Sequence, residues 1–99
     1  MVAPHGDLRP DLFVAMRVLD RLWSRGEPAL RTNLQAATNL SYDGLVRYLK
    51  WLEERGLVVS EVGADGKTLV RITPRGVEAY RQFIEWVADF AERKMGPTR

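Results

Sequence analysis

The sequence predicts a mainly α-helical domain with one small β-hairpin, which is an α+β fold. Apolar residues recur at the three- and four-residue spacing of helices over most of the chain. Only residues 57–73 are instead rich in branched side chains, in which apolar and polar residues partly alternate as they do in strands. The 99 residues, of which 45% are hydrophobic and 28% charged, suit one soluble domain. We expect a flexible arm at residues 1–9, a domain at 10–73, a long helix at 74–95 and a tail at 96–99.

The composition narrows the kinds of site that the chain can hold. Cysteine is absent, which excludes disulfides and thiolate-bound zinc, and we expect neither a metal ion nor a cofactor. The longest apolar run, at residues 12–16, is too short to span a bilayer. No signal segment opens the chain, so we expect a cytoplasmic protein without a membrane partner. A net charge of +2 is compatible with nucleic-acid binding but does not require it.

The first helix is expected to begin near Pro10 and to end before Gly26. Proline suits an early helical position, where its missing N–H costs nothing, and glycine stops the helix. One stripe at helical spacing should face the core. Its members are Leu12, Ala15, Met16, Leu19, Leu22 and Trp23.

A short second helix is expected after an extended link at residues 30–31. Thr32 and Gln35 have the spacing of a capping box, in which the first residue caps the helix and the fourth reaches back. The helix would cover about residues 33–38 and end at Asn39, because asparagine tolerates the left-handed conformation.

A third helix is expected at residues 41–55. Ser41 is a good N-cap, and Gly56 supplies the left-handed residue that ends a helix. Gly44 is unusual inside a helix and would permit close approach of either a neighbouring helix or DNA. The buried stripe consists of Leu45, Leu49 and Leu52, and the opposite face carries Tyr42, Val46, Arg47, Lys50 and Glu54. Two short helices joined by a tight turn are typical of a helix-turn-helix, whose second helix enters the DNA major groove.

Two strands are expected at residues 57–62 and 68–73, directly after this recognition helix. Between them, the Asp65-Gly66 pair is a strong signal for a hairpin turn. A hairpin in this place is a wing, so the domain is predicted to be a winged helix-turn-helix. Lys67, with Arg71 behind it, is expected to touch the DNA backbone; the alternative is a charged tip that serves solubility.

The long helix at residues 74–95 is expected to have Thr73 as its cap and Pro74 in its first turn. Two neighbouring apolar stripes run along it, one of them spaced like a coiled-coil seam. One stripe can pack on the domain, but the other would leave large aromatic residues in water unless a second copy covers it. We therefore predict a homodimer, with an interface that consists of Tyr80, Phe83, Ile84, Trp86, Val87, Phe90 and Ala91.

The chain resembles archaeal winged helix-turn-helix proteins in several short motifs that lie within residues 12–95. The motifs are Asn-Leu-Ser-Tyr at 39–42, Tyr-Leu at 48–49, Leu52, Gly-Leu at 56–57 and Ile-Thr-Pro-Arg-Gly at 72–76. The resemblance implies a dimer formed by the last helix as an antiparallel coiled coil. It also implies binding to duplex DNA, either as a regulator or as a chromatin-associated protein. The low net charge and the moderate length of the last helix favour a site-selective regulator over bulk coating of DNA.

Eight residues are candidates for DNA contact. Arg47 can bond a guanine edge with two hydrogen bonds, and Lys50 suits a phosphate. Alternatively both belong to a solvated face, for example with Lys50 paired to Glu54. Tyr42 either contacts DNA or packs on the preceding helix. Thr32 and Ser41, the predicted caps of the second and third helices, have a structural role first. The candidates are Thr32, Asn33, Ser41, Tyr42, Arg47, Lys50, Lys67 and Arg71.

The leading hypothesis is a homodimeric protein that binds double-stranded DNA and regulates transcription. The alternative is a winged-helix module for protein–protein interaction within a larger assembly, because the net charge is modest and several aromatic residues lack an obvious cover. An enzyme is not expected. Carboxylates such as Glu53 and Glu85 have no neighbouring histidine, metal-ligand partner or glycine-rich loop.

Overall fold

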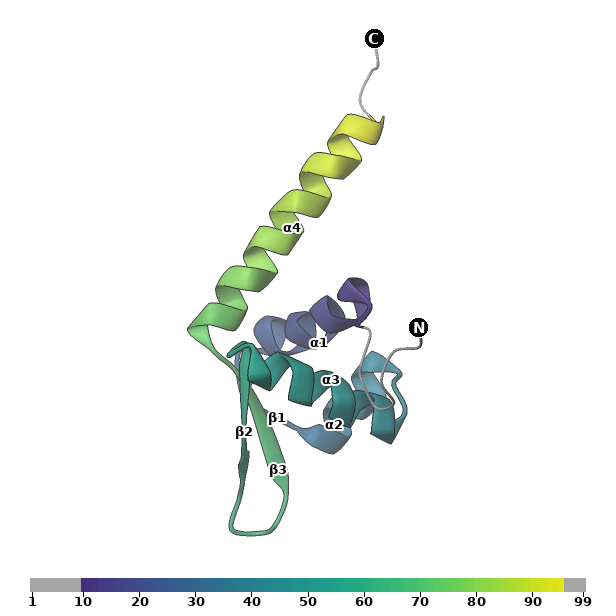
Figure 1. The fold of residues 1–99 in the computed structure, drawn as a ribbon. Helices are drawn as coiled ribbons and strands as arrows, with labels where there is room; N and C mark the ends of the chain where they lie inside the picture. Colours follow the sequence, from purple (N-terminus) through teal and green to yellow (C-terminus); the bar gives the residue numbers. More distant parts are fainter. Residues whose placement is uncertain (1–9, 96–99) are drawn as a thin grey trace, which may run out of the picture.

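Seven helices and strands follow one another in the computed structural model, which describes residues 10–95 (Figure 1). They are α1 (Leu12–Arg25), β1 (Ala29–Leu30), α2 (Arg31–Thr38), α3 (Tyr42–Glu54), β2 (Val58–Val62), β3 (Thr68–Ile72) and α4 (Pro74–Met95). The predicted α+β fold is confirmed. The predicted arm at 1–9 and tail at 96–99 lie outside the described residues.

The first helix, α1, begins two residues later than predicted. Its N-cap is Asp11, whose carboxylate accepts hydrogen bonds from two amides of the first turn at 2.8 and 3.4 Å. The aspartate satisfies amides of the first turn that would otherwise lack a partner, and this fixes the start of the helix after Asp11. Pro10 therefore lies outside the helix. The predicted end is confirmed, since Gly26 has a φ of 70° and donates its N–H to the Leu22 carbonyl.

The predicted buried stripe of α1 is confirmed in its middle and wrong at both ends. Leu12 and Trp23 are 54% and 46% exposed. Both lie in terminal turns of the helix, on the flank of the stripe, where fewer neighbouring elements cover the side chain. The buried members are Ala15, Met16, Leu19 and Leu22, together with Val18, which was not predicted.

The second helix, α2, begins earlier than predicted, and the predicted capping box is wrong. Leu30 occupies the N-cap position, and no side chain bonds the first amides of the helix. Leu30 is extended because β1 pairs with β3, so the backbone passes directly from a strand into the helix. Thr32 consequently falls within the first turn. Asn39 ends the helix at a φ of 60°, as predicted.

The third helix, α3, has the start and the end that were predicted. The Ser41 hydroxyl accepts from the Gly44 amide at 3.0 Å. At the other end Gly56 has a φ of 74°, and the Leu57 amide donates to the Leu52 carbonyl at 2.9 Å, a common way to close a helix. The buried residues are Leu45, Leu49 and Leu52, as predicted, and Tyr48.

The sheet has three strands in the order β1-β3-β2, all antiparallel, one strand more than predicted. In the hairpin, Val58 pairs with Ile72 and Val62 pairs with Thr68. The turn uses the predicted glycine, since Gly66 has a φ of 81°. The strand that was not predicted is β1, because it is only two residues long and shows no alternation.

Two side chains hold the helix-turn-helix against α1. The Tyr48 hydroxyl accepts the Asp11 amide at 2.9 Å, and the Arg17 guanidinium donates to the Thr38 carbonyl at 2.9 Å. These bonds join α1 to α3 and to the end of α2, around a shared core. Both bonds therefore support the helix-turn-helix on the side that faces α1.

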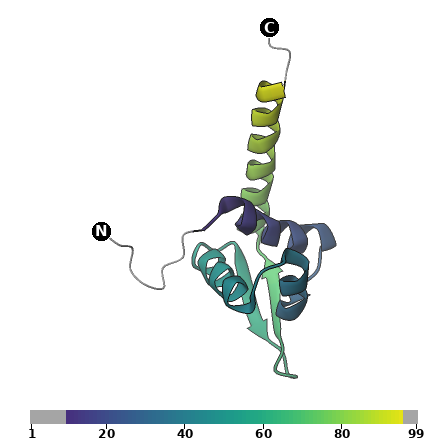
Figure 2. The ribbon, with the colours of Figure 1, turned by 90° about the vertical axis from the view of Figure 1, so that its right-hand side faces the viewer.

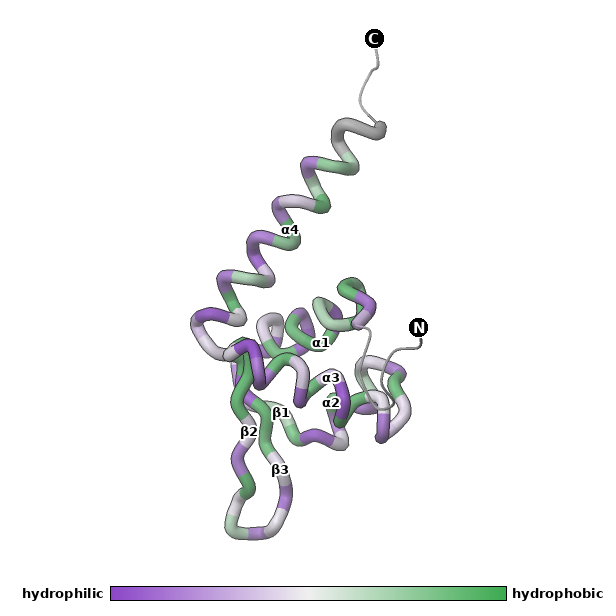
Figure 3. Tube along the Cα trace, viewed as in Figure 1, coloured by the Kyte–Doolittle hydropathy of each residue, from purple (hydrophilic) through white to green (hydrophobic). Residues whose placement is uncertain are grey.

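The last helix, α4, leaves the domain on the side opposite the tip of the hairpin (Figures 1 and 2). Thr73 caps it as predicted, with its hydroxyl accepting from the Gly76 amide at 3.0 Å. Ala79, Tyr80 and Phe83 pack partly on the core. Figure 3 shows that hydrophobic residues continue to recur along α4 beyond this region.

Tyr80 ties α4 to α1 through a hydrogen bond from its hydroxyl to the Asp20 carboxylate. This bond is the largest cause of a raised pKa, and burial and the negative charge of Asp20 add to it. Together they raise the pKa of Tyr80 from 10.0 to about 12. Because the folded-state pKa lies above the ordinary value, the stabilisation is complete below pH 10.0 and is lost as the pH rises to about 12.

Removing this hydroxyl gives a direct check. Tyr80→Phe is expected to abolish a tyrosinate titration step near pH 12, followed by ultraviolet absorbance. The variant should also lose less stability than the wild type between pH 10.0 and 12, because the titrating group is gone. A late step that persists in the variant would show that another tyrosine carries it.

Candidate nucleic-acid interface

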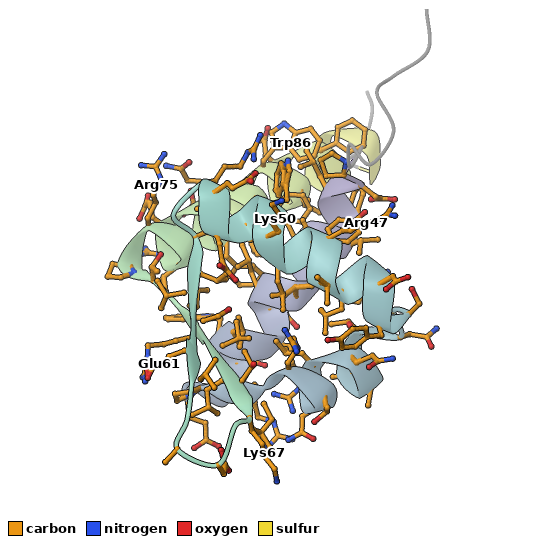
Figure 4. The ribbon with its side chains drawn as sticks, turned by 60° about the horizontal axis from the view of Figure 1, so that its bottom comes forward. Arg47, Lys50, Glu61, Lys67, Arg75 and Trp86 are labelled. Carbon is orange, nitrogen blue, oxygen red and sulfur yellow. The ribbon has the colours of Figure 1, made fainter. Side chains whose placement is uncertain are left out.

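The outer ridge of α3 carries four exposed charged residues of both signs: Asp43, Arg47, Lys50 and Glu54. They lie opposite the buried stripe, as the helical period requires. Within residues 10–95, neither Arg47 nor Lys50 makes a hydrogen bond or an ion pair, so the alternative of a Lys50–Glu54 pair is not formed. Figure 4 shows both cations on α3 and Lys67 at the end of the hairpin. The ridge therefore offers two cations that no carboxylate of the described chain neutralises.

The start of α3 is built around its cap. Ser41 accepts from the Gly44 amide, and a Cβ added at Gly44 would lie 3.1 Å from the serine oxygen. Glycine at this position therefore leaves room for the cap, which is a local reason for a residue that is unusual in a helix. Ser41 is engaged as a cap, as its sequence position suggested.

A cavity of about 270 Å³ lies where α2, α3 and the hairpin meet. Arg31 and Thr32 come from the first turn of α2, Tyr42 begins α3, and Lys67 comes from the hairpin tip. Three of the eight candidate residues thus share one hollow. Its lining residues are Leu30, Arg31, Thr32, Tyr42, Gly66, Lys67 and Thr68.

Arg31 is the functional candidate in this cavity that sequence reasoning missed. Its guanidinium donates to the Tyr42 hydroxyl at 3.0 Å and lies 5.3 Å from the centre of the tyrosine ring. The tyrosine ring therefore contacts α2 through this arginine, and it is also 49% exposed. Arg31 was placed in an extended link because the apparent capping box put the start of the helix after it.

Asn33 and Arg71 lie apart from this cavity. Asn33 lines a separate hollow of about 230 Å³ with Arg21 and Arg25 of α1. Arg71 forms an ion pair with Glu61 at 3.5 Å. In the strand register its neighbour Val70 is buried, so Arg71 lies on the opposite face of the sheet. The structure therefore does not bring Arg71 together with the other cations.

The hairpin is held at a defined distance from α3. The Ser60 hydroxyl of β2 donates to the Glu53 carboxylate at 2.7 Å. At the tip, the Gly63 amide donates to the Lys67 carbonyl at 2.8 Å, and the Asp65 carboxylate accepts the Lys67 amide at 3.0 Å. These bonds fix the backbone of the tip and leave the Lys67 side chain exposed.

A row of aromatic rings starts on α1 and continues along the face of α4 that meets α1. Phe13 of α1 meets Phe83 edge-on with ring centres 5.5 Å apart, and Trp86 stacks on Phe90 at 5.8 Å. Phe83 and Trp86 lie 6.4 Å apart and join the two pairs. We call these four residues the aromatic row. Trp86 is 59% exposed, so the row is a solvent-facing apolar surface.

Of the predicted interface residues, Tyr80 and Phe83 pack partly on the core of the chain itself. Ile84, Trp86, Phe90 and Ala91 are exposed, and Val87 is half-buried. Phe13 was not predicted in this surface, because nothing in the sequence places the start of α1 beside α4.

No group of three or more histidine, cysteine, aspartate or glutamate side chains in residues 10–95 could hold a metal ion. None of the helices in the same range is long and apolar enough to cross a membrane.

The sequence matches the winged helix-turn-helix family over residues 9–88. No curated protein sequence matches it. A MarR-family transcriptional regulator from Silicibacter pomeroyi has a similar structure, with a TM-score of 0.70 and 27% identity over 86% of this chain and 58% of that chain. The transcriptional regulator BldR from Sulfolobus solfataricus has a TM-score of 0.73 and 17% identity over 88% and 63%.

A structure of S. aureus MepR with DNA is also similar, with a TM-score of 0.69 and 14% identity over 82% of this chain and 68% of that chain. At 17% and 14% identity, the likenesses to BldR and MepR establish the fold alone. The chain spans 63% and 58% of the length of BldR and of the Silicibacter protein. The match over residues 9–88 covers most of the sequence, and the chain therefore belongs to the winged helix-turn-helix family.

Proposed function

We propose that the chain is a homodimeric regulator of transcription that binds double-stranded DNA. The observation that carries the proposal is that three elements of the winged helix-turn-helix present cations. Arg31 of α2 and Lys67 of the hairpin line one cavity, and Arg47 and Lys50 are exposed on the outer ridge of α3. In this family fold, such an arrangement brings a helix to the major groove and a wing beside it. MarR-family regulators and the MepR–DNA complex have this fold.

The residues have different roles in the proposal. Arg47 reads a base edge in the major groove, where a guanidinium can bond guanine with two hydrogen bonds. Lys50 contacts a phosphate, as lysine commonly does in protein–DNA complexes. The cavity beside them receives a backbone phosphate between Arg31 and Lys67, with Tyr42 holding the arginine in place. Thr32 lines the same cavity.

Asp43 and Glu54 on the same ridge repel phosphate, so one copy is expected to bind weakly. A second copy bound to the same duplex would add a second, identical set of contacts and so raise the overall affinity. The proposal therefore includes dimerisation, and it assigns the interface to the exposed apolar face of α4. That face exposes Ile84 and Trp86, and the row continues onto Phe13 of α1. Large exposed apolar surfaces of this kind commonly mark interaction sites.

Alanine variants test the proposed face one residue at a time. Arg47→Ala and Arg31→Ala are each expected to weaken duplex binding about tenfold or more, since such contacts contribute roughly 1–3 kcal/mol. Arg71→Ala is the matched control, because it removes the same charge from the opposite face of the sheet. We expect it to change affinity less than about twofold. Equal losses in all three variants, measured by fluorescence anisotropy, would refute this assignment of the face.

A protein-interaction module is the second candidate, and the exposed aromatic row is the observation that favours it. The two functions respond differently to substitution. If the module is correct, Arg47→Ala and Lys67→Ala leave partner binding intact, whereas Trp86→Asp abolishes it. If the regulator is correct, Arg47→Ala weakens duplex binding directly.

A further inference from the structure

The end of α3 and the start of α4 are fastened to each other by a compact set of contacts. We call this set the α3–α4 clamp. The Thr73 amide donates to the Leu57 carbonyl at 3.0 Å, and the Thr73 hydroxyl donates to the Gly56 carbonyl at 2.6 Å. The residues of the clamp are Arg55, Gly56 and Leu57 after α3, and Thr73, Arg75 and Gly76 at the start of α4.

Backbones meet closely in the clamp. A Cβ added at Gly76 would lie 2.1 Å from the Leu57 carbonyl oxygen and 2.8 Å from a side-chain carbon of Ile72. Both distances are far shorter than ordinary contacts between non-bonded atoms. The first turn of α4 therefore rests directly on the backbone that leaves α3, without side chains between them.

Arg75 extends the clamp into α3 itself. Its Nε donates to the Arg55 carbonyl at 3.0 Å. Arg55 in turn donates to the Trp51 carbonyl at 3.3 Å, and its guanidinium lies 4.0 Å from the centre of the Trp51 ring. Trp51 packs against the core. A continuous series of contacts thus leads from the core through the last turn of α3 to the base of α4, where Figure 4 labels Arg75.

The angle between α4 and α3 depends on the α3–α4 clamp, which holds the first turn of α4. The helix has 22 residues. Among its side chains up to residue 91, the part that the structure describes, Tyr80 and Phe83 are the last to pack on the core. A tilt of about 10° would move the far end of a helix about 33 Å long by roughly 6 Å. Because the dimer proposed above pairs two α4 helices, the angle between α3 and α4 would set the separation of the two recognition helices.

We propose that Arg75 is a positioning residue that determines which spacing of two DNA half-sites the dimer accepts. It does so without touching DNA, by holding α4 at a fixed angle to α3. This inference rests on the dimeric DNA-binding function proposed above. It predicts that loss of Arg75 widens the range of accepted spacings and leaves the contact of each α3 with its half-site unchanged.

The first experiment measures spacing preference. Duplexes would carry two copies of the half-site selected by the wild-type protein, with the separation varied one base pair at a time. The wild type should prefer one spacing by on the order of 100-fold, since avidity is lost when both sites cannot be engaged together. Arg75→Ala should reduce this preference to roughly tenfold or less. Its affinity for a duplex with one half-site should stay within about twofold.

The second experiment measures the angle without DNA. The chain has no cysteine, so a pair of spin labels can be placed at Glu54→Cys on α3 and Glu85→Cys on α4, both exposed positions. Ile84→Asp would be included to remove distances between copies. The distribution of label distances should be narrow with Arg75 and broader with Arg75→Ala. Arg81→Ala is the matched control, because it removes an arginine from α4 that makes no hydrogen bond with α3 within residues 10–95.

The outcomes separate the two proposals. If the wild type selects single half-sites with no preferred spacing, the dimeric mode of binding fails and the role of Arg75 in spacing fails with it. If the wild type prefers one spacing and Arg75→Ala keeps that preference, only the role of Arg75 is refuted. An unchanged distance distribution in Arg75→Ala, or an equal broadening in Arg81→Ala, would also overturn it.

Discussion

Gly76→Ala is expected to lower the free energy of unfolding by about 3 kcal/mol, near the upper end for overpacked sites. The added methyl carbon would lie 2.1 Å from the Leu57 carbonyl oxygen, which is a backbone atom and cannot rotate away. Either the start of α4 or the segment after α3 must move. Urea unfolding followed by circular dichroism would measure the loss.

Gly26→Ala is the control for this experiment. Gly26 has a φ of 70° and no atom within 4 Å of an added Cβ, so its substitution tests backbone strain without steric conflict. The expected cost is about 1–2 kcal/mol, the usual penalty for a left-handed residue with a side chain. If Gly76→Ala costs no more than Gly26→Ala, the close packing of α4 on the backbone after α3 is not a major source of stability.

The double variant Ile84→Asp, Trp86→Asp is expected to be monomeric and to lose about 100-fold or more in affinity for a two-site duplex. The two side chains are 44% and 59% exposed, so the charges should leave the monomer folded. They would, however, place carboxylates in the proposed interface, where an unpaired charge is costly. Light scattering reports the mass, and a gel-shift titration reports the affinity.

The control replaces one exposed residue of α4 outside the apolar face, Gln82→Asp. It adds a carboxylate to the same helix and should remain dimeric. A double variant with the mass of the wild type would remove α4 as the dimer interface. So would a wild type that is itself monomeric at micromolar concentration.

Most element boundaries in this chain were predictable because local chemistry determines them. Ser41 bonds the first turn of α3, Thr73 bonds the first turn of α4, and Gly26 takes the left-handed conformation that a helix end needs. Each of these roles involves residues only a few positions apart. Local sequence is therefore sufficient to identify them.

The start of α2 was wrong for a reason that lies elsewhere in the chain. Thr32 and Gln35 have the spacing of a capping box, but β1 pairs with β3, which lies about forty residues later in the sequence. That pairing extends Leu30 and starts the helix at Arg31. The same error hid Arg31 as a candidate ligand, because an arginine in an extended link has no defined neighbour.

The grouping of the candidate cations also depended on tertiary structure. Lys67 and Arg71 are close in sequence, and both were predicted to contact DNA from the wing. The register of the hairpin instead places Arg71 against Glu61 on the opposite face, whereas Lys67 lies at the tip beside Arg31. Strand register assigns alternate residues to opposite faces, and the sequence shows that assignment only when one face is clearly apolar.

The most direct test of duplex binding is its dependence on salt. Wild-type protein would be titrated into duplexes obtained by selection, at several salt concentrations, with binding followed by fluorescence anisotropy. About four to eight phosphate contacts per dimer predict a log–log slope of roughly −4 to −7. Failure to bind any duplex at low salt, or an affinity that does not change with salt, would contradict DNA binding by this protein.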